Sequence, residues 1–345
     1  MSSHNVRIGI IGAGVAAETH ARELGHVDGA LLHSVFARDQ AKAQKFAAAF
    51  SVSRVSADLI EFLADPNLDA VIITTPNGLH LEYALAVARA GKHLIVEKPL
   101  EIDEFRAQQI VAVCKQHDVK LFIIYQRRYS DAAAKALDDI RSGRLGKVVL
   151  VNIVDNQYRK AEYYSKDAWR GTKAVEGGGC VITQSTHMLD LAQYLLGPVR
   201  SLFALTRTAY HAIETEDVAA VTLEFDSGVI GTFSSSTAAY PGQRHMVTIS
   251  GTKGSIIING EHDQVIFRKV VAEDDWRELP KGFSFADPVE PRDYPTGGQR
   301  RQLEIIVKVL LGEGEDLEGP DHLGAVRLVD AIYRSAKEGR PVSVL

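Results

Sequence analysis

The sequence has few cysteines and no long uninterrupted apolar run. Only two cysteines, Cys114 and Cys180, occur in 345 residues, which argues against a disulfide framework and favours a reducing compartment. The apolar run at residues 6–17 is broken by glycines and is too short to span a bilayer. We therefore expect a cytoplasmic protein that has no membrane partner.

The sequence also lacks a strong excess of charge of either sign. Lys and Arg number 39 against 44 Asp and Glu, which gives a net charge of −5. This balance does not favour nucleic acid as a partner. The composition is that of an ordinary globular protein, with 46% hydrophobic residues, and the length suffices for two domains.

Short apolar runs alternate with helical patterns in the first third of the chain. The runs cover residues 7–14, 30–37, 69–75, 92–98 and 119–125, and the helical patterns cover residues 17–27, 40–50, 78–90 and 103–117. Near-continuous apolar runs are typical of parallel strands that are buried on both faces. We therefore expect a doubly wound α/β domain over residues 1–125, built from βαβ units.

Residues 126–345 have a different pattern. Strand-like runs dominate from residue 147 to residue 269, and helical patterns follow at residues 299–311 and 322–337. We interpret this part as a substrate-binding and oligomerisation α/β domain, with a C-terminal helix that packs back on the first domain. Residues 272–298 hold several prolines and aromatic residues and are expected to cover the site.

A phosphate-binding pattern, Gly12-x-Gly14-x-x-Ala17, follows the first apolar run and opens the first helix. Gly12 permits a tight turn and Gly14 permits the close approach of a pyrophosphate, which the helix start at Val15 and Ala16 would bind. A glycine turn in another kind of α/β protein is the alternative. The strand–turn–helix context favours a dinucleotide cofactor.

The end of the second apolar run indicates which dinucleotide is used. Ala37 stands where an acidic residue usually binds the ribose 2′-hydroxyl of NAD, and Arg38 follows. An arginine at this point pairs with a 2′-phosphate, so NADP(H) is favoured while NAD(H) stays possible. The alternative is that Arg38 only stacks on the adenine. Asp39 more plausibly starts the next helix.

Polar residues follow the third apolar run. Thr75, Pro76 and Asn77 come at its end, and His80 lies in the first turn of the helix after it. Ligands of open α/β sheets bind beyond the carboxyl ends of the strands. We therefore expect all four residues to bind the cofactor.

A Glu–Lys pair followed by a proline ends the fourth run, at Glu97 and Lys98. Such a pair is usually a solvated surface pair. At the carboxyl edge of a dinucleotide-binding sheet it becomes a candidate for the reacting centre and a cofactor contact. Gln126, just after the last run, is also expected to reach the cofactor.

Five motifs carry a resemblance to a known family. GAGVAA, TTPNGLH, EKP, WRG and GGG followed by H-x-x-D occur in this order. In these motifs the chain resembles the glucose–fructose oxidoreductase / inositol dehydrogenase / rhizopine-catabolism (Gfo/Idh/MocA) family over nearly its whole length. The resemblance implies a Rossmann domain, then a domain with a large, open, mostly antiparallel sheet. It also implies an NAD(P)-dependent oxidoreductase of sugars, inositols or related polyols.

The resemblance assigns roles to individual residues of this chain. Lys98 would be the catalytic lysine and His187 the catalytic histidine, while Trp169 and Arg170 would lie beside the cofactor. In many relatives the position of Thr183 is an aspartate that works with the histidine. Thr183 cannot act as a base near neutral pH, so we interpret it as a residue that positions the substrate.

The segment at residues 177–190 contains candidate residues for proton transfer. Three glycines indicate that something approaches the chain closely, with the cofactor and substrate as candidates. On a helix after Gly179, the residues Thr183, His187 and Asp190 would share one face. Histidine, with a reference pKa of about 6.5, suits proton transfer, and Lys98 would polarise the developing oxyanion. Asp190 would orient the helix or a neighbouring side chain.

Several alternatives remain open from the sequence. A histidine on a helix is more often a hydrogen-bonded core residue than a catalyst, and the tyrosines at positions 158, 163 and 164 either line a sugar pocket or pack on the sheet. The whole protein could instead hold its dinucleotide tightly and dismutate sugars or cleave glycosides, or act as a non-catalytic sensor. No metal site is expected, because further ligands are missing at suitable spacing. An open sheet face predicts a homodimer or homotetramer.

Overall fold

The computed structural model describes residues 5–242, 245–260, 263–271, 296–315 and 321–344. The chain forms two compact units, the first from Met1–Gln126 and Thr296–Leu323, the second from Arg127–Pro295 and Gly324–Leu345. Most of the segment 272–298, which was expected to cover the site, lies outside the described residues. Each unit is considered by itself below.

The first unit contains a six-stranded sheet in which every pair of neighbours is parallel. Its strand order is β3-β2-β1-β4-β5-β6. The strands are β1 (Val6–Ile11), β2 (Ala30–Phe36), β3 (Arg54–Ser56), β4 (Ala70–Ile73), β5 (His93–Val96) and β6 (Leu121–Ile123). The order reverses between β1 and β4, which is where ligands bind in doubly wound sheets. The predicted N-terminal fold is thus confirmed.

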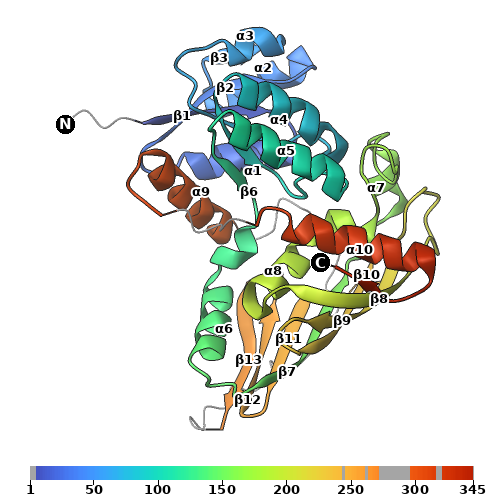
Figure 1. The fold of residues 1–345 in the computed structure, drawn as a ribbon. Coiled ribbons are helices and arrows are strands. Elements are labelled where there is room, and N and C mark those ends of the chain that lie inside the picture. The colour runs from blue at the N-terminus through green and yellow to red at the C-terminus, as the bar shows by residue number, and fades with distance from the viewer. Residues whose placement is uncertain (1–4, 243–244, 261–262, 272–295, 316–320, 345) are drawn as a thin grey trace. The chain divides into compact units, whose positions relative to one another are not determined.

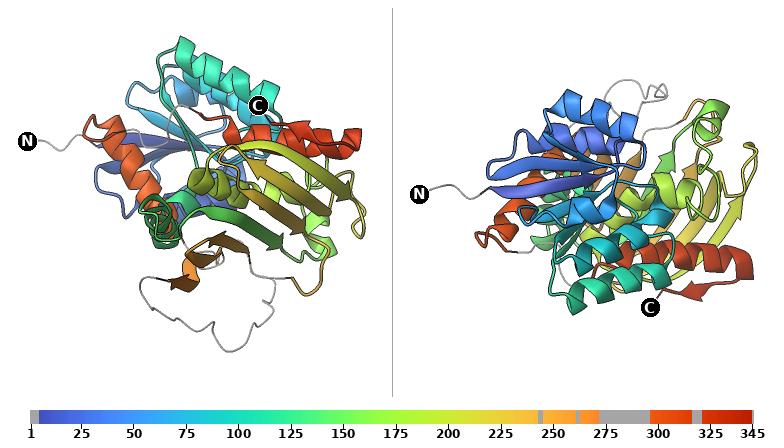
Figure 2. Two further views of the ribbon diagram at one scale, coloured as in Figure 1. Left: turned by 60° about the horizontal axis from the view of Figure 1, so that its bottom comes forward. Right: turned by 90° about the horizontal axis from the view of Figure 1, so that it is seen from above.

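Helices cover both faces of this sheet (Figures 1 and 2). They are α1 (Val15–Leu24), α2 (Gln40–Phe50), α3 (Leu59–Leu63), α4 (His80–Arg89), α5 (Glu104–Gln116) and α9 (Gly297–Leu310), with a 3₁₀ turn η1 at Asn77–Leu79. Ile8, Ile72 and Ile95 of the strands are completely buried, as expected for a sheet that is covered on both sides. The helix α9 joins this core from far along the chain through Leu303 and Ile306.

The second unit contains an eight-stranded sheet with the order β13-β12-β11-β7-β10-β9-β8-β14. Its strands are β7 (Val148–Asn156), β8 (Val199–Arg207), β9 (Val218–Phe225), β10 (Ile230–Ser236), β11 (Met246–Gly251), β12 (Gly254–Asn259), β13 (Gln264–Val270) and β14 (Val342–Ser343). Only the β7–β10 pair is parallel. The prediction of a large, mostly antiparallel sheet is therefore confirmed.

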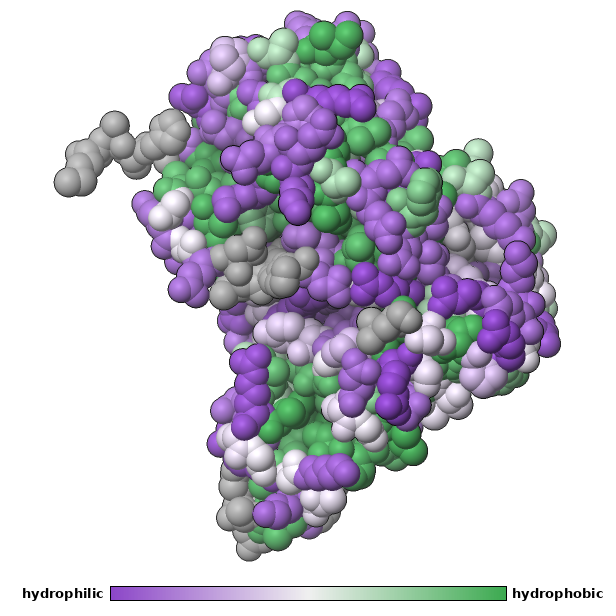
Figure 3. Space-filling model, viewed as in Figure 1, coloured by the Kyte–Doolittle hydropathy of each residue, from purple (hydrophilic) through white to green (hydrophobic). Residues whose placement is uncertain are grey.

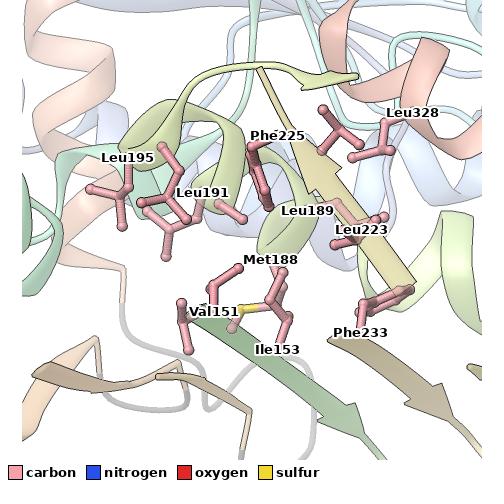
Figure 4. Close-up of a cluster of buried hydrophobic side chains, with 14 of the residues drawn as sticks. Val151, Ile153, Met188, Leu189, Leu191, Leu195, Leu223, Phe225, Phe233 and Leu328 are labelled. Carbon is pink, nitrogen blue, oxygen red and sulfur yellow. The ribbon is translucent and has the colours of Figure 1, made fainter. Parts of the chain in front are cut away.

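Helices pack on one face of this second sheet. They are α6 (Asp131–Arg141), α8 (Thr186–Leu196) and α10 (Gly324–Glu338). The described chain also has a short helix α7 (Ala161–Ser165), a 3₁₀ turn η2 (Gln126–Tyr129) and a π-helical turn η3 (Cys180–Gln184). Figure 4 shows Met188, Leu189 and Leu191 of α8 above Val151 and Ile153 of β7. Each such buried side chain contributes roughly 1.5–3 kcal/mol through the hydrophobic effect.

The other face of the second sheet is less covered by the described residues. Leu205 of β8 is 47% exposed and Ile230 of β10 is 58% exposed. Figure 3 views the side on which α6, α8 and α10 lie, and there too apolar residues reach the surface in the lower part of this unit. The second sheet therefore has one buried face and one that is partly apolar and accessible.

Candidate active site

The glycine turn between β1 and α1 has the geometry of a phosphate-binding loop. Gly12 has a φ of +114°, and a Cβ there would collide with Thr74 Oγ1. Gly14 is the residue before α1, and a Cβ there would have nothing within 4 Å. Val15 and Ala16 form the first turn of the helix, whose free N–H groups attract anions. The turn thus leaves open space next to a helix N-terminus.

The end of β4 presents the predicted group Thr75 to Asn77. Thr75 Oγ1 is buried and has no hydrogen-bond partner among the described residues. Pro76 precedes the turn η1, and Asn77 is buried at its start. His80 is fully buried, with Nε2 at 2.9 Å from the Thr75 carbonyl oxygen and Nδ1 at 3.0 Å from that of Pro99. His80 therefore links the ends of β4 and β5 within the first unit.

Glu97 and Lys98 follow β5, and the Lys98–Pro99 peptide bond is cis. Glu97 Oε1 lies 2.7 Å from Nε2 of His20, a fully buried residue of α1, while Oε2 accepts a hydrogen bond from the Lys98 N–H. Gln299 Nε2 lies 3.0 Å from the other ring nitrogen of His20. Burial raises the pKa of Glu97, but the hydrogen bond and charge of His20 outweigh it, so this pKa is lowered. Glu97 is thereby held ionised.

Gln126 lies at the end of the first unit, and its Oε1 atom is buried without a hydrogen-bond partner in the described part of the chain. A Cβ at Gly298 would collide with the Gln126 carbonyl oxygen, so α9 begins in close contact with this residue. Gln126 Oε1, Thr75 Oγ1 and the space beside Gly14 fit a dinucleotide, which presents hydrogen-bond donors and phosphates to such groups.

Arg38 is exposed and follows the end of β2 by two positions. Asp39 caps α2, because its Oδ1 accepts a hydrogen bond from the Lys42 N–H at 3.1 Å. The prediction that Asp39 starts the next helix is confirmed. Arg38 is therefore the charged residue that remains at the tip of β2.

In the second unit, the protein itself fills the space beside two of the three glycines. A Cβ at Gly178 would collide with the hydroxyl group of Tyr333, and a Cβ at Gly179 would collide with the carbonyl oxygen of Glu216. The close approach that the glycines predict is thus made here by Tyr333 of α10 and by the chain before β9.

The predicted continuous α-helix after Gly179 is wrong. Residues Cys180–Gln184 form a π-helical turn, and α8 begins only at Thr186. The cause is Glu216, whose carboxylate accepts hydrogen bonds from the N–H groups of Gly179 and Val181, both at 2.9 Å. The α-helical spacing that was assumed for Thr183, His187 and Asp190 therefore holds only within α8.

Thr183 has a carboxylate as its partner. Its hydroxyl group donates to Glu176 Oε1 at 2.9 Å, and Glu176 Oε2 accepts from the Gly171 N–H. Glu176 is 1% exposed. Burial raises its pKa, and the hydrogen bonds from Gly171 and Thr183 only partly offset this. Burial likewise raises the pKa of Glu216.

His187 is half-buried in the first turn of α8. One turn further on, Asp190 is almost fully buried and accepts a hydrogen bond from Arg128 Nε at 2.8 Å. Burial raises the pKa of Asp190, while the charge of Arg128 acts in the opposite direction. The guanidinium group of Arg128 also lies 5.5 Å from the ring centroid of Tyr194. Asp190 thus fixes α8 to the turn η2.

Arg170 is engaged with its own neighbours. Its guanidinium carbon lies 4.2 Å from the ring centroid of Tyr163 and 4.5 Å from that of Trp169. Its Nε donates to Asp167 at 3.2 Å, and Nη1 donates to the Tyr163 hydroxyl group. The Tyr163 hydroxyl also accepts from Gln184 at 3.1 Å. This stack therefore connects the WRG motif to the π-helical turn.

The structure brings Lys98, Glu97, Thr75 and His80 together in the first unit, and Thr183, His187 and Asp190 onto one segment of the second. Sequence reasoning missed His20, Glu176, Glu216 and Tyr333. A carboxylate directly before three glycines was a usable signal for Glu176. His20, Glu216 and Tyr333 carry no local signal, because their partners are distant in sequence. No group of three or more potential metal-ligating side chains occurs among the described residues.

Comparisons with known proteins identify the family. Residues 6–125 match the model described as an oxidoreductase family with an NAD-binding Rossmann fold, and residues 133–257 match the GFO/IDH/MocA C-terminal domain. The chain belongs to the GFO/IDH/MocA family. The predicted resemblance is confirmed, as is the class of enzyme, an oxidoreductase with an NAD-binding Rossmann unit.

Relatives span both units. The scyllo-inositol 2-dehydrogenase (NAD(+)) of Bacillus subtilis strain 168 is 31% identical over 261 residues, which are 74% of each chain. The myo-inositol 2-dehydrogenase of Thermotoga maritima is 27% identical and covers 98% of each chain. The WlbA dehydrogenase of Bordetella pertussis, solved in complex with NADH and UDP-GlcNAcA, aligns with a TM-score of 0.85 at 29% identity over 99% of each chain.

Within the described residues, no helix is both long and apolar enough to cross a membrane.

Proposed function

We propose that this GFO/IDH/MocA oxidoreductase interconverts a secondary hydroxyl group and a ketone on a sugar, an inositol or a related polyol. The supporting relatives are dehydrogenases of inositols and levoglucosan. The observation in this chain that carries the proposal is that it has both a lysine, Lys98, and a histidine, His187, at the positions where the family motifs place the catalytic residues. Lys98 lies two residues after β5 of the first sheet, and His187 lies in the first turn of α8.

Each candidate residue of this chain has a separate role in the proposed reaction. A bound nicotinamide dinucleotide supplies the hydride chemistry. Lys98 stabilises negative charge on the substrate oxygen, and the His20–Glu97 pair holds the chain on which Lys98 is carried. His187 takes the hydroxyl proton in oxidation and returns it in reduction. Thr183 positions the substrate.

Dinucleotide-dependent turnover of a polyol panel, followed by the absorbance of the reduced nicotinamide, tests this proposal. We expect the wild type to oxidise at least one inositol or sugar. Lys98→Met and His187→Asn should each lower kcat/KM by roughly a hundredfold to ten-thousandfold. A fluorescence titration should show that both variants still bind dinucleotide. Full activity in either variant would contradict the role given to that residue.

We further propose that NADP(H) is preferred over NAD(H). Arg38 is exposed at the tip of β2, and the preceding Ala37 offers no carboxylate to the ribose. Several similar proteins are named with NAD⁺ or NADH, so the preference is a property to be measured on this chain. The proposal rests on Arg38 and on the absence of an acidic side chain at Ala37.

Fluorescence titrations of NADPH and NADH against wild type and Arg38→Ala measure that preference. We expect tighter binding of NADPH in the wild type, lost in Arg38→Ala by about tenfold or more, while NADH binding changes little. Arg54→Ala is a matched control, because Arg54 is also on this sheet but pairs with Asp65 at 3.0 Å. NADH binding equal to or tighter than that of NADPH would overturn the preference.

The open face of the second sheet supports a homodimer or homotetramer. It exposes Leu205 and Ile230, and a hollow on it is lined by small residues including Ala220, Ser234 and Ala239. Sheet faces of this kind become buried by symmetric association. Light scattering of Ile230→Lys, compared with wild type, tests this: a smaller particle supports association through the face, and an unchanged one contradicts it.

The state of the two cysteine thiols bears on the cellular compartment of the protein. Both cysteines are free and buried, and burial raises the pKa of Cys114 to about 12. Such thiols do not require an oxidising environment. On this ground we propose a cytoplasmic location, which fractionation of cells that express the protein would test.

A further inference from the structure

Glu216, which the proposed function does not use, holds the start of the segment that carries His187. Its buried carboxylate accepts hydrogen bonds from the N–H groups of Gly179 and Val181, both at 2.9 Å. Its carbonyl oxygen accepts from the Cys180 N–H at 3.0 Å. The first N–H groups of a helical segment have no acceptor within the segment. Here one residue, just before β9, supplies the acceptors for three consecutive N–H groups.

The hydrogen bonds at the other end of η3 belong to two helical registers. The Ser185 nitrogen lies 3.1 Å from the carbonyl oxygen of Cys180, five residues back, and 3.2 Å from that of Val181, four residues back. The first spacing is that of a π-helix and the second is that of an α-helix. Keeping only the second bond would turn η3 into ordinary α-helix. The π register therefore depends on what holds the start of the segment.

A change of register in η3 would displace His187. The hydrogen bond from Arg128 to Asp190 and the apolar side chains of α8 hold that helix, while Glu216 holds the start of the segment. Conversion of η3 to α-helix would rotate these two ends relative to each other by about 100°, the angle between successive residues of an α-helix. His187 lies between the two ends, two positions after Ser185, where the registers meet. The direction of its ring therefore follows the register of η3.

We propose that Glu216 is a positioning residue for His187: by holding the first N–H groups of η3 it selects the π register and so fixes the imidazole ring for proton transfer. The inference rests on the proposed function, in which His187 exchanges the proton of the substrate. Glu216 acts through the backbone of the segment and takes no part in the transfer itself. Tyr333, whose hydroxyl group donates to Glu216 Oε1 at 3.0 Å, holds the carboxylate in place.

Glu216→Gln removes at least one of the bonds that select the register. An amide has a single acceptor oxygen, and its NH₂ group can only donate. Because the two carboxylate oxygens serve different N–H groups, either Gly179 or Val181 loses its acceptor. The turn should then relax towards the α register and displace the ring of His187. We expect kcat/KM for polyol oxidation to fall by about tenfold to a hundredfold.

Asp217, the next residue in the chain, offers a matched control. It is fully buried, and its carboxylate accepts hydrogen bonds from the N–H groups of Ala209, Tyr210 and His211 at 2.6, 2.9 and 2.8 Å. Asp217→Asn therefore loses the same kind of bond, in a segment that carries no residue of the proposed reaction. Its stability should fall, while its kcat/KM should stay within about twofold of the wild type. Equal losses of kcat/KM in the two variants would indicate a general structural loss and overturn the proposal.

Nuclear magnetic resonance of the histidine rings, recorded on the enzyme without ligands, measures the displacement directly. The signal of His187 is assigned by its absence in His187→Asn. It should shift in Glu216→Gln and stay at its wild-type position in Asp217→Asn, where the register of η3 is unaffected. An unchanged His187 signal in Glu216→Gln would overturn the proposal.

Glu216→Asp provides the test where Glu216→Gln does not fold. Aspartate keeps both acceptor oxygens but is shorter by one methylene group, so we expect it to lose contact with Gly179 or Val181. The His187 signal should shift in this variant as well, and a wild-type signal would overturn the proposal. A wild type that oxidises no polyol would instead contradict the proposed function, and the His187 signal would still test how Glu216 positions the ring.

Discussion

The two glycine segments of this protein look alike in sequence but differ in what surrounds them. Beside Gly14 of the first unit, a Cβ would have nothing within 4 Å. Beside Gly178 and Gly179 of the second unit, a Cβ would meet Tyr333 and Glu216. The first segment leaves open space beside Gly14, whereas the glycines of the second are required by the packing of the chain. A glycine pattern alone therefore does not distinguish a binding loop from a packed turn.

The buried carboxylates next to these segments differ in the same way. In the first unit, His20 lowers the pKa of Glu97 against the effect of burial. In the second unit, burial raises the pKa of Glu176 and Glu216, whose partners are backbone N–H and hydroxyl groups. At Glu97 the interactions with His20 and Lys98 outweigh burial, whereas at Glu176 and Glu216 burial outweighs the hydrogen bonds from their neutral donors.

The largest effect is expected for Gly179→Ala. The new methyl group would collide with the Glu216 backbone, which cannot move without breaking the bonds that hold the π-helical turn. The free energy of unfolding should fall by about 3 kcal/mol or more, measured by urea denaturation. A stability within about 0.5 kcal/mol of the wild type would mean that this segment is not packed as described.

Tyr333→Phe should have the next largest effect. The Tyr333 hydroxyl donates to Glu216 Oε1 at 3.0 Å, so its loss leaves a buried carboxylate with one donor fewer. We expect a loss of about 2 kcal/mol in the free energy of unfolding. Tyr240→Phe, at a tyrosine that is 80% exposed, should leave stability unchanged. Equal stability of the two variants would contradict the role of the hydroxyl group.

Gly14→Ala should affect binding but not folding. Its φ of −98° suits alanine, so the free energy of unfolding should stay within about 0.5 kcal/mol of the wild type. The methyl group would occupy the open space beside Gly14, where we expect the pyrophosphate to bind, and dinucleotide binding should weaken by about tenfold or more. Fluorescence titration and urea denaturation of the same preparation measure both. Unchanged affinity would show that the pyrophosphate does not approach Gly14.

The smallest expected effect is on how the free energy of unfolding depends on pH, compared between Glu97→Gln and Glu176→Gln. The pKa of Glu97 is lowered in the folded state, so its stabilisation is present above its ordinary pKa of 4.5 and is lost as the pH falls through the lowered value. The pKa of Glu176 is raised, so its stabilisation is present below 4.5 and is lost as the pH rises through the raised value.

Relative to wild type, Glu176→Gln should therefore gain stability as the pH rises from 4.5 through the raised pKa of Glu176. Glu97→Gln should show no such gain, because Glu97 is ionised in both the folded and the unfolded protein over most of this range. Urea denaturation across the range measures both. Parallel curves for the two variants would contradict the contrast between the two carboxylates.

Local patterns allowed much of the fold to be predicted. Continuous apolar runs gave the strands of the first sheet, and the N-caps Asp39 and Asp103 act on N–H groups three residues away. The π-helical turn could not be predicted in this way. The carboxylate that shapes it, Glu216, comes 35 residues after Val181 in the chain, and its effect depends on the sheet that places it there. The pairing of His20 with Glu97 is likewise a product of the fold.

The helix α9 has a consequence for how this protein is made on the ribosome. It supplies Leu303 and Ile306 to the core of the first unit and Gln299 to His20. During synthesis, the first 126 residues emerge long before this helix does. The dinucleotide-binding unit therefore waits for most of the second unit to be translated before its hydrophobic core is complete. Ribosome-bound chains that stop before residue 297 would expose apolar surface to chaperones, although every strand of the first sheet is already present.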